Sequence, residues 1–186
     1  MKLSNEAYEN IKQAVADMLV DYNIKGVPIN AFEVAIKIGL TVIPYSALSA
    51  SKRKESLRYS VDGYSVEGLD GSWTIYYNDF RKDFSRINQT IMHEVGHYIL
   101  GHTKEGPQEE AEAKFFAKYT LASPPLLHNM KAARTVENVM NSFAIGYQAA
   151  NIALDNYQSW LIYGPIEYVA YERKILCQLE IDISTA

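Results

Sequence analysis

Three features that would point to other classes of protein are nearly absent from this sequence: cysteine, long apolar runs and an excess of basic charge. Cys177 is the only cysteine among 186 residues, which excludes an internal disulfide and a metal site made of cysteines alone. The 18 Lys and Arg against 22 Asp and Glu give a formal net charge of −4, so we expect no direct binding to nucleic acid. No stretch reaches the roughly 20 apolar residues that span a bilayer, and the first residues do not resemble a signal peptide. We therefore expect a cytoplasmic protein that does not enter membranes.

The residues that are present have the composition of a globular protein, with elements in an α+β order. Hydrophobic residues make up 48% of the chain and charged residues 22%. Apolar periodicity and strand-forming runs predict helices over residues 7–22, 30–39, 86–101, 108–122 and much of 126–186, and strands over residues 40–43, 57–61, 64–66 and 73–77. Residues 46–55 are predicted to be a loop. We expect a mainly helical α+β fold with a small, aromatic-rich sheet of about three strands beside the helix 86–101.

The segment His93-Glu94-Val95-Gly96-His97 points to chemistry, because it fits the H-E-x-x-H pattern of zinc peptidases. Histidines four residues apart lie about 40° apart around a helix axis, so both imidazoles can reach one metal ion. Glu94 lies about 100° from His93, where its carboxylate can take a proton from a water molecule at the metal. We predict that His93 and His97 are metal ligands and that Glu94 is the catalytic base.

The helical phase of this segment supports a site that faces away from the core. Measured from Ile87, four side chains fall between about 20° and 120° around the axis: Ile91, Val95, Tyr98 and Ile99. The two histidines fall at about 240° and 280°. Gly96 has no side chain to obstruct an element that packs over the helix. The phase therefore predicts that the histidines face a cleft.

A catalytic zinc site has three protein ligands and leaves one position for water, so a third ligand is needed. The sequence offers more than one candidate for it. His102 does not have the spacing of a metzincin ligand, so we expect it at the helix end or as a residue that supports a ligand. Glu112 shares the apolar face of helix 108–122, where a carboxylate is costly unless it is paired or binds a metal, and is preferred. Glu109, about 60° away, is the alternative ligand, and Glu110 is predicted to point to solvent.

These motifs resemble those of the ImmA/IrrE-type metallopeptidases. The specific segments are IMHEVGHYILGH at residues 91–102 and EAKFFA at residues 112–117, with support from residues 24–29, 35–40 and 75–78. The resemblance covers about residues 10–125 and implies one Zn²⁺ per chain, held by His93, His97 and Glu112, with Glu94 as base. Another divalent metal would suit the same residues. We expect a metallopeptidase domain over residues 1–125, and a helical extension over 126–186 that packs on it and is a candidate for partner recognition.

The resemblance also implies a biological role. The family consists of cytoplasmic proteases that cleave or inactivate helix-turn-helix repressors, often encoded on mobile genetic elements. We therefore expect a protein substrate, a transcriptional repressor, and an antirepressor function. The alternative is a non-proteolytic regulatory module that contains a metal and inactivates or recruits a transcription factor. Glu94 argues against this alternative, because a purely structural site has no use for a carboxylate beside the metal.

Residues on both sides of the motif are candidates for the substrate cleft. Residues 73–78 are the predicted edge strand, to which a substrate backbone can be added as a further strand. Tyr76, Tyr77 and Asn78 at its end are candidate cleft residues, and either tyrosine could stabilise an oxyanion. His102 is the fourth candidate.

Overall fold

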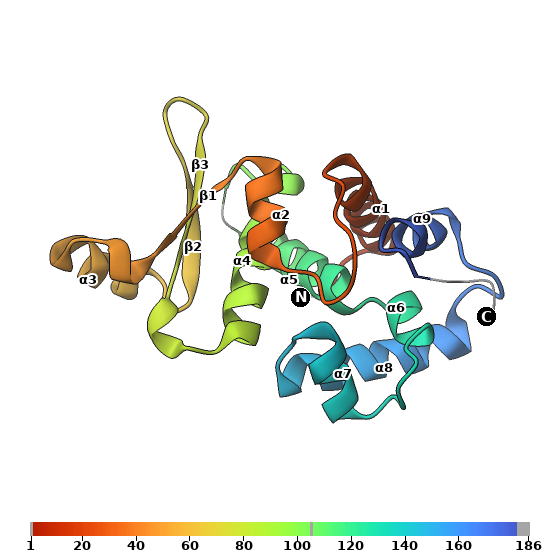
Figure 1. The fold of residues 1–186 in the computed structure, drawn as a ribbon. Coiled ribbons are helices and arrows are strands. Elements are labelled where there is room, and N and C mark those ends of the chain that lie inside the picture. Colours follow the sequence, from red (N-terminus) through yellow and green to blue (C-terminus); the bar gives the residue numbers. More distant parts are fainter. Residues whose placement is uncertain (1, 105, 182–186) are drawn as a thin grey trace.

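The computed structural model describes residues 2–104 and 106–181, which form a mainly helical α+β fold (Figure 1). The helices are α1 (Asn5–Asp21), α2 (Ala31–Ile38), α3 (Ala50–Tyr59), α4 (Phe84–Ile99), α5 (Pro107–Ala122), α6 (Pro124–His128), α7 (Val136–Phe143), α8 (Tyr147–Tyr163) and α9 (Ala170–Gln178). The strands are β1 (Thr41–Pro44), β2 (Gly63–Glu67) and β3 (Trp73–Tyr77), and short 3-10 turns lie at Tyr45–Ala47 and Asp79–Arg81. The predicted fold class is confirmed.

The three strands form one mixed sheet in the order β1-β3-β2. β3 pairs with β1 in parallel, with Thr41 opposite Thr74, and with β2 in antiparallel, with Gly63 opposite Tyr77. β2 and β3 form a hairpin, and Gly71 in the turn between them has a left-handed φ of +79°, which glycine adopts without strain. The prediction that residues 73–78 form an edge strand is wrong: β3 is the central strand, and β1 and β2 are the two edge strands. The strand order could not be predicted from the sequence, because β1 is distant from β3 in the chain and pairs with the edge of β3 opposite to β2.

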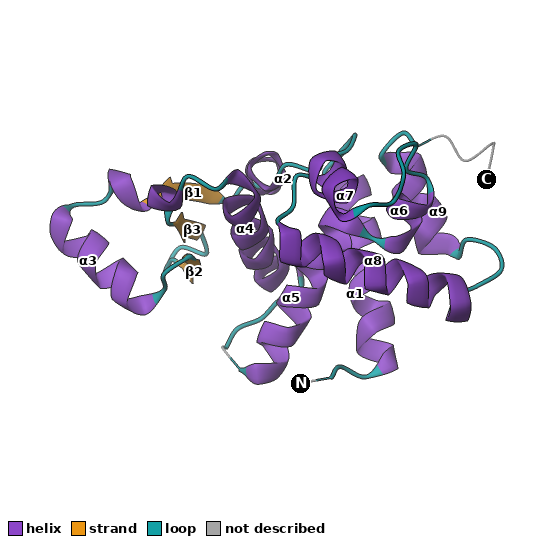
Figure 2. Cartoon of the chain, turned by 90° about the horizontal axis from the view of Figure 1, so that it is seen from below, coloured by secondary structure: helices purple, strands orange, loops and turns teal. Residues whose placement is uncertain are grey.

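The segment between β1 and β2 also differs from the prediction. Residues 46–55 were expected as a loop and 57–61 as a strand, but residues 50–59 form α3. The Ser49 side chain caps this helix by accepting a hydrogen bond from the Lys52 backbone N–H, and Ser56 is its buried residue. A helix that is exposed around most of its circumference has no apolar periodicity to reveal it. Figures 1 and 2 both place α3 at the end of the molecule, beyond the sheet.

The core lies between the sheet and the helices that pack on it. Ile75 of β3, Ile91 and Met92 of α4, and Phe116 of α5 are fully buried in one cluster. Asn88 of α4 is also fully buried, and it ties this helix to the start of α2. Its amide Nδ2 donates to the Ile29 carbonyl at 3.0 Å, and its Oδ1 accepts from the Ala31 backbone N–H at 2.7 Å. The helix that carries the histidines is therefore held in place by polar as well as apolar contacts.

The C-terminal helices continue the same core. α8 packs against α5, and α9 returns to pack against α1. α8 ends at Tyr163, immediately before Gly164 and Pro165, because proline cannot continue a helix. Within the two described ranges, no helix is long and apolar enough to cross a membrane. The last five residues of the predicted extension, 182–186, lie outside the described residues.

We expect Asn88→Ala to lower the free energy of unfolding by about 2 kcal/mol. The substitution leaves the Ile29 carbonyl and the Ala31 N–H buried without their partner. Urea unfolding in the presence of a chelator measures the change. Asn151→Ala is the matched control, since Asn151 is more exposed and donates to the Tyr147 carbonyl one turn back on its own helix α8. Equal stability of the two variants would contradict the role assigned to Asn88.

Candidate metal centre

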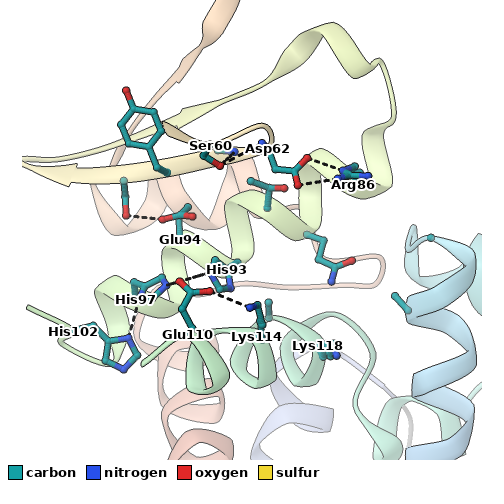
Figure 3. Close-up of a pocket in the computed structure, with 18 of the residues that line it drawn as sticks. Ser60, Asp62, Arg86, His93, Glu94, His97, His102, Glu110, Lys114 and Lys118 are labelled. Atoms are coloured by element: carbon teal, nitrogen blue, oxygen red, sulfur yellow. Dashed lines mark hydrogen bonds and ion pairs between the residues drawn. The ribbon is translucent and has the colours of Figure 1, made fainter. Parts of the chain in front are cut away.

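The close approach of α4 and α5 builds the site. A Cβ added at Gly96 would lie 3.0 Å from Cδ1 and 3.3 Å from Cβ of Phe116, so glycine allows the two helices to approach closely at this point. The expectation that Gly96 leaves room for a packing element is thus confirmed. This contact places the first turns of α5 beside the last turns of α4, where His93 and His97 lie (Figure 3).

Three side chains from these helices converge: His93, His97 and Glu110. The Nε2 atoms of the two histidines are 3.1 Å apart. Oε1 of Glu110 lies 3.3 Å from Nε2 of His97 and 3.6 Å from Nε2 of His93. The histidine side chains are 18% and 11% exposed, so the group is sheltered but accessible. These are the atoms that could hold a metal ion.

The triangle has the dimensions of a tetrahedral site. Ligand bonds of about 2.1 Å in tetrahedral geometry place ligand atoms about 3.4 Å apart, close to all three separations. Two imidazole nitrogens and one carboxylate oxygen are also a ligand set found in catalytic zinc sites. The residues present therefore fit a divalent metal ion that keeps one position open.

The electrostatics favour the protonation states that a metal requires. Burial, together with the neighbouring His97, lowers the pKa of His93 to about 4, so its imidazole is neutral at pH 7 and has a lone pair to donate. Burial alone would raise the pKa of Glu110, but the hydrogen bond from Lys114 and the nearby His93 hold it below its usual value. Nζ of Lys114 lies 3.1 Å from Oε2 of Glu110, which leaves Oε1 turned toward the histidines.

The third member of the group differs from the prediction. The structure places Glu110, not Glu112 or Glu109, beside the two imidazoles. Glu112 instead lies against His102, and the carboxylate of Glu109 lies over Gly106 at the start of α5. Helical phase was misleading because α5 packs against both α4 and α1 and is buried on more than one face. Glu112 lies beside His102 and not beside His93 and His97.

Glu94, the predicted base, is buried to 7% exposure and lies under the edge strand. The hydroxyl of Ser65, in β2, donates a hydrogen bond of 2.7 Å to Oε2 of Glu94. Figure 3 shows Glu94 between this strand and the histidines. The carboxylate is therefore held by an element other than its own helix, which restricts its rotamer.

A cleft of about 1080 Å³ opens over these residues. β2, α4, α5 and the N-terminal end of α8 line it, and His93, Glu94, His97, His102 and Glu110 face it. Its size suits an extended peptide segment. The histidines thus face a cleft, as their helical phase predicted.

Of the four predicted cleft residues, the structure places only His102 in the lining. Tyr76 stacks on Tyr64 of the neighbouring strand, and Tyr77 packs edge-on against Phe32. Asn78 is buried and donates to the Val61 carbonyl. Each of these three side chains is engaged elsewhere in the fold and none lines the cleft, so the structure does not support them as cleft residues.

Comparison with known proteins adds no relative: no protein-family model, curated protein or solved structure matches this chain. The arrangement of its own residues therefore carries the functional argument.

Two residues of the site escaped the sequence analysis. Ser65 has no local signal, because its partner Glu94 is 29 residues away. The sequence offers no specific signal for Glu110 either. Lys114 follows it at the i,i+4 spacing of an ion pair, but such pairs are common on helix surfaces and do not indicate a metal ligand.

We expect Glu110→Ala to weaken Zn²⁺ binding by more than 100-fold, since the loss of a ligand exceeds the roughly 10–100-fold effect of residues that only support a ligand. Competition with a chromophoric chelator measures the affinity. Glu109→Ala is the matched control and should bind Zn²⁺ like the unmodified chain. A larger loss in Glu112→Ala than in Glu110→Ala would restore Glu112 as the ligand.

Proposed function

We propose that this protein is a zinc-dependent metalloendopeptidase that cleaves a partner protein. The observation that carries the proposal is the triangle of His93, His97 and Glu110, with sides of 3.1, 3.3 and 3.6 Å, at the floor of an open cleft. A carboxylate follows the first histidine and lines the same cleft. The resemblance to ImmA/IrrE-type metallopeptidases supports a helix-turn-helix repressor as the substrate and an antirepressor role.

In this proposal each residue has a separate task. His93, His97 and Glu110 would hold the zinc ion, which supplies Lewis acidity toward a peptide carbonyl and a water molecule. Glu94 takes a proton from the attacking water and then delivers it to the nitrogen of the leaving amine. Ser65 keeps the carboxylate of Glu94 oriented during both transfers by its hydrogen bond to Oε2.

The edge strand supports an extended substrate. Among the described residues, β2 pairs only with β3, so its other edge has backbone groups available to a substrate strand. The same strand lines the cleft and contacts Glu94 through Ser65. A peptide paired with β2 would therefore run past the base and the histidines.

The decisive test is cleavage of a repressor encoded beside the gene for this chain. We expect the zinc-loaded protein to produce two fragments, identified by mass spectrometry, and expect a chelator or Glu94→Gln to abolish them while Glu94→Gln still binds Zn²⁺. Glu33→Gln, on the exposed surface of α2, is the control and should cleave normally. Cleavage by Glu94→Gln at the unmodified rate would refute its role as base. A repressor that stays intact but is inactivated would favour the non-proteolytic module.

Ser65→Ala should lower kcat about tenfold with Zn²⁺ affinity unchanged, because it removes a hydrogen bond to a charged carboxylate without altering a ligand. Ser65→Thr keeps the hydroxyl and should recover most of the rate. Ser72→Ala is the control, since the Ser72 hydroxyl donates to Asp70 within the exposed β2–β3 turn. If Ser65→Ala and Ser72→Ala had the same kcat, Ser65 would not position Glu94.

A further inference from the structure

His102 folds back onto one of the two histidines of the metal centre, because the chain turns sharply after α4. Gly101 has a left-handed φ of +67°, and the N–H groups of Gly101 and His102 bond to the carbonyls of Tyr98 and His97. This pair of hydrogen bonds is the Schellman arrangement that ends many helices, and it favours glycine at the left-handed position. The turn brings Nδ1 of His102 to 2.9 Å from Nδ1 of His97.

A second contact holds His102 from the opposite side. Nε2 of His102 lies 3.0 Å from Oε2 of Glu112, and the Gln108 amide donates to Oε1 of the same carboxylate at 2.9 Å. The side chains of His102 and Glu112 are only 8% and 17% exposed. A continuous chain of hydrogen bonds therefore runs from α5 to the far ring nitrogen of His97.

If His97 binds a metal through Nε2, only one placement of the protons satisfies every hydrogen bond in this series. Nδ1 of His97 must then carry the proton and donate it to Nδ1 of His102. His102 must in turn be protonated at Nε2, where it donates to Glu112, and an ionised carboxylate can only accept. Both nitrogens of His102 are thus engaged, so it has none left for a metal.

We propose that His102 and Glu112 are positioning residues for the metal centre: they fix the tautomer and the ring orientation of His97 and so raise metal affinity. The proposal rests on the metal centre of the proposed function and assigns a task to both residues without placing either one on the metal or the substrate. Histidine ligands commonly donate their second N–H to such a partner, whose loss weakens metal binding about 10–100-fold.

The test uses Zn²⁺ alone, with affinity measured by chelator competition on the full chain. His102→Leu removes the acceptor for His97 and should weaken binding about 10–100-fold. In His102→Asn, the side-chain oxygen can occupy the place of Nδ1, so this variant should recover most of the affinity. Glu109→Gln is the control for Glu112→Gln, and thermal unfolding of the metal-free variants shows whether each one folds.

A double-variant comparison separates a positioning role from a general loss of stability. Glu112→Gln should weaken Zn²⁺ binding in the unmodified chain but not in the His102→Leu background, where the connection between Glu112 and His97 is already cut. Long-range ¹H–¹⁵N spectra of the zinc-loaded protein should show His102 protonated at Nε2. Unchanged affinity in a folded His102→Leu variant, or a proton on Nδ1 of His102, would overturn the proposal.

The outcomes also distinguish this proposal from the peptidase function. If the protein binds Zn²⁺ and these substitutions weaken that binding, but it cleaves no repressor, the positioning role is supported and the peptidase function is refuted. If repressor cleavage requires Glu94 but Zn²⁺ affinity does not change when His102 is substituted, the peptidase function is supported and the positioning role of His102 and Glu112 is refuted.

Discussion

The packing of α4 against α5 at Gly96 and Phe116 is the contact on which the rest of the site depends. It brings a glutamate of one helix to within 3.3 and 3.6 Å of two imidazole nitrogens of the other. All three side chains project from helices whose positions are set by the core, so their separation changes little when loops move. A larger side chain at position 96 would meet Phe116 and push α4 and α5 apart, which would lengthen the distances from Glu110 to the two imidazoles.

The position of α5 between two neighbours gives its acidic residues different tasks. Glu110 lies beside His93 and His97, while Glu112 lies beside His102. Two carboxylates two residues apart on α5 thus contact different histidines. Lys114 and Gln108 each bond to one oxygen of these carboxylates and leave the other oxygen turned toward an imidazole.

The sheet contributes to the site through β2, one of its two edge strands. β2 lines the cleft and contacts Glu94 through Ser65, and among the described residues its outer edge pairs with no other strand. Gly63 in the same strand lies so close to Thr90 of α4 that an added Cβ would be 2.7 Å from its methyl group. The strand is therefore packed directly on the helix that carries the histidines.

The sequence by itself determined the elements that local signals control: α4 and α5, the three strands, the turn at Gly71 and the motif from His93 to His97. These depend on periodicity, caps and spacing within a few residues. Only the tertiary structure decided which strand is central and which glutamate meets the histidines. Both depend on contacts between segments that are distant in the sequence. A helix that is buried on several faces does not show in its own residues which neighbour each face will contact. The same holds for a strand that pairs on both sides.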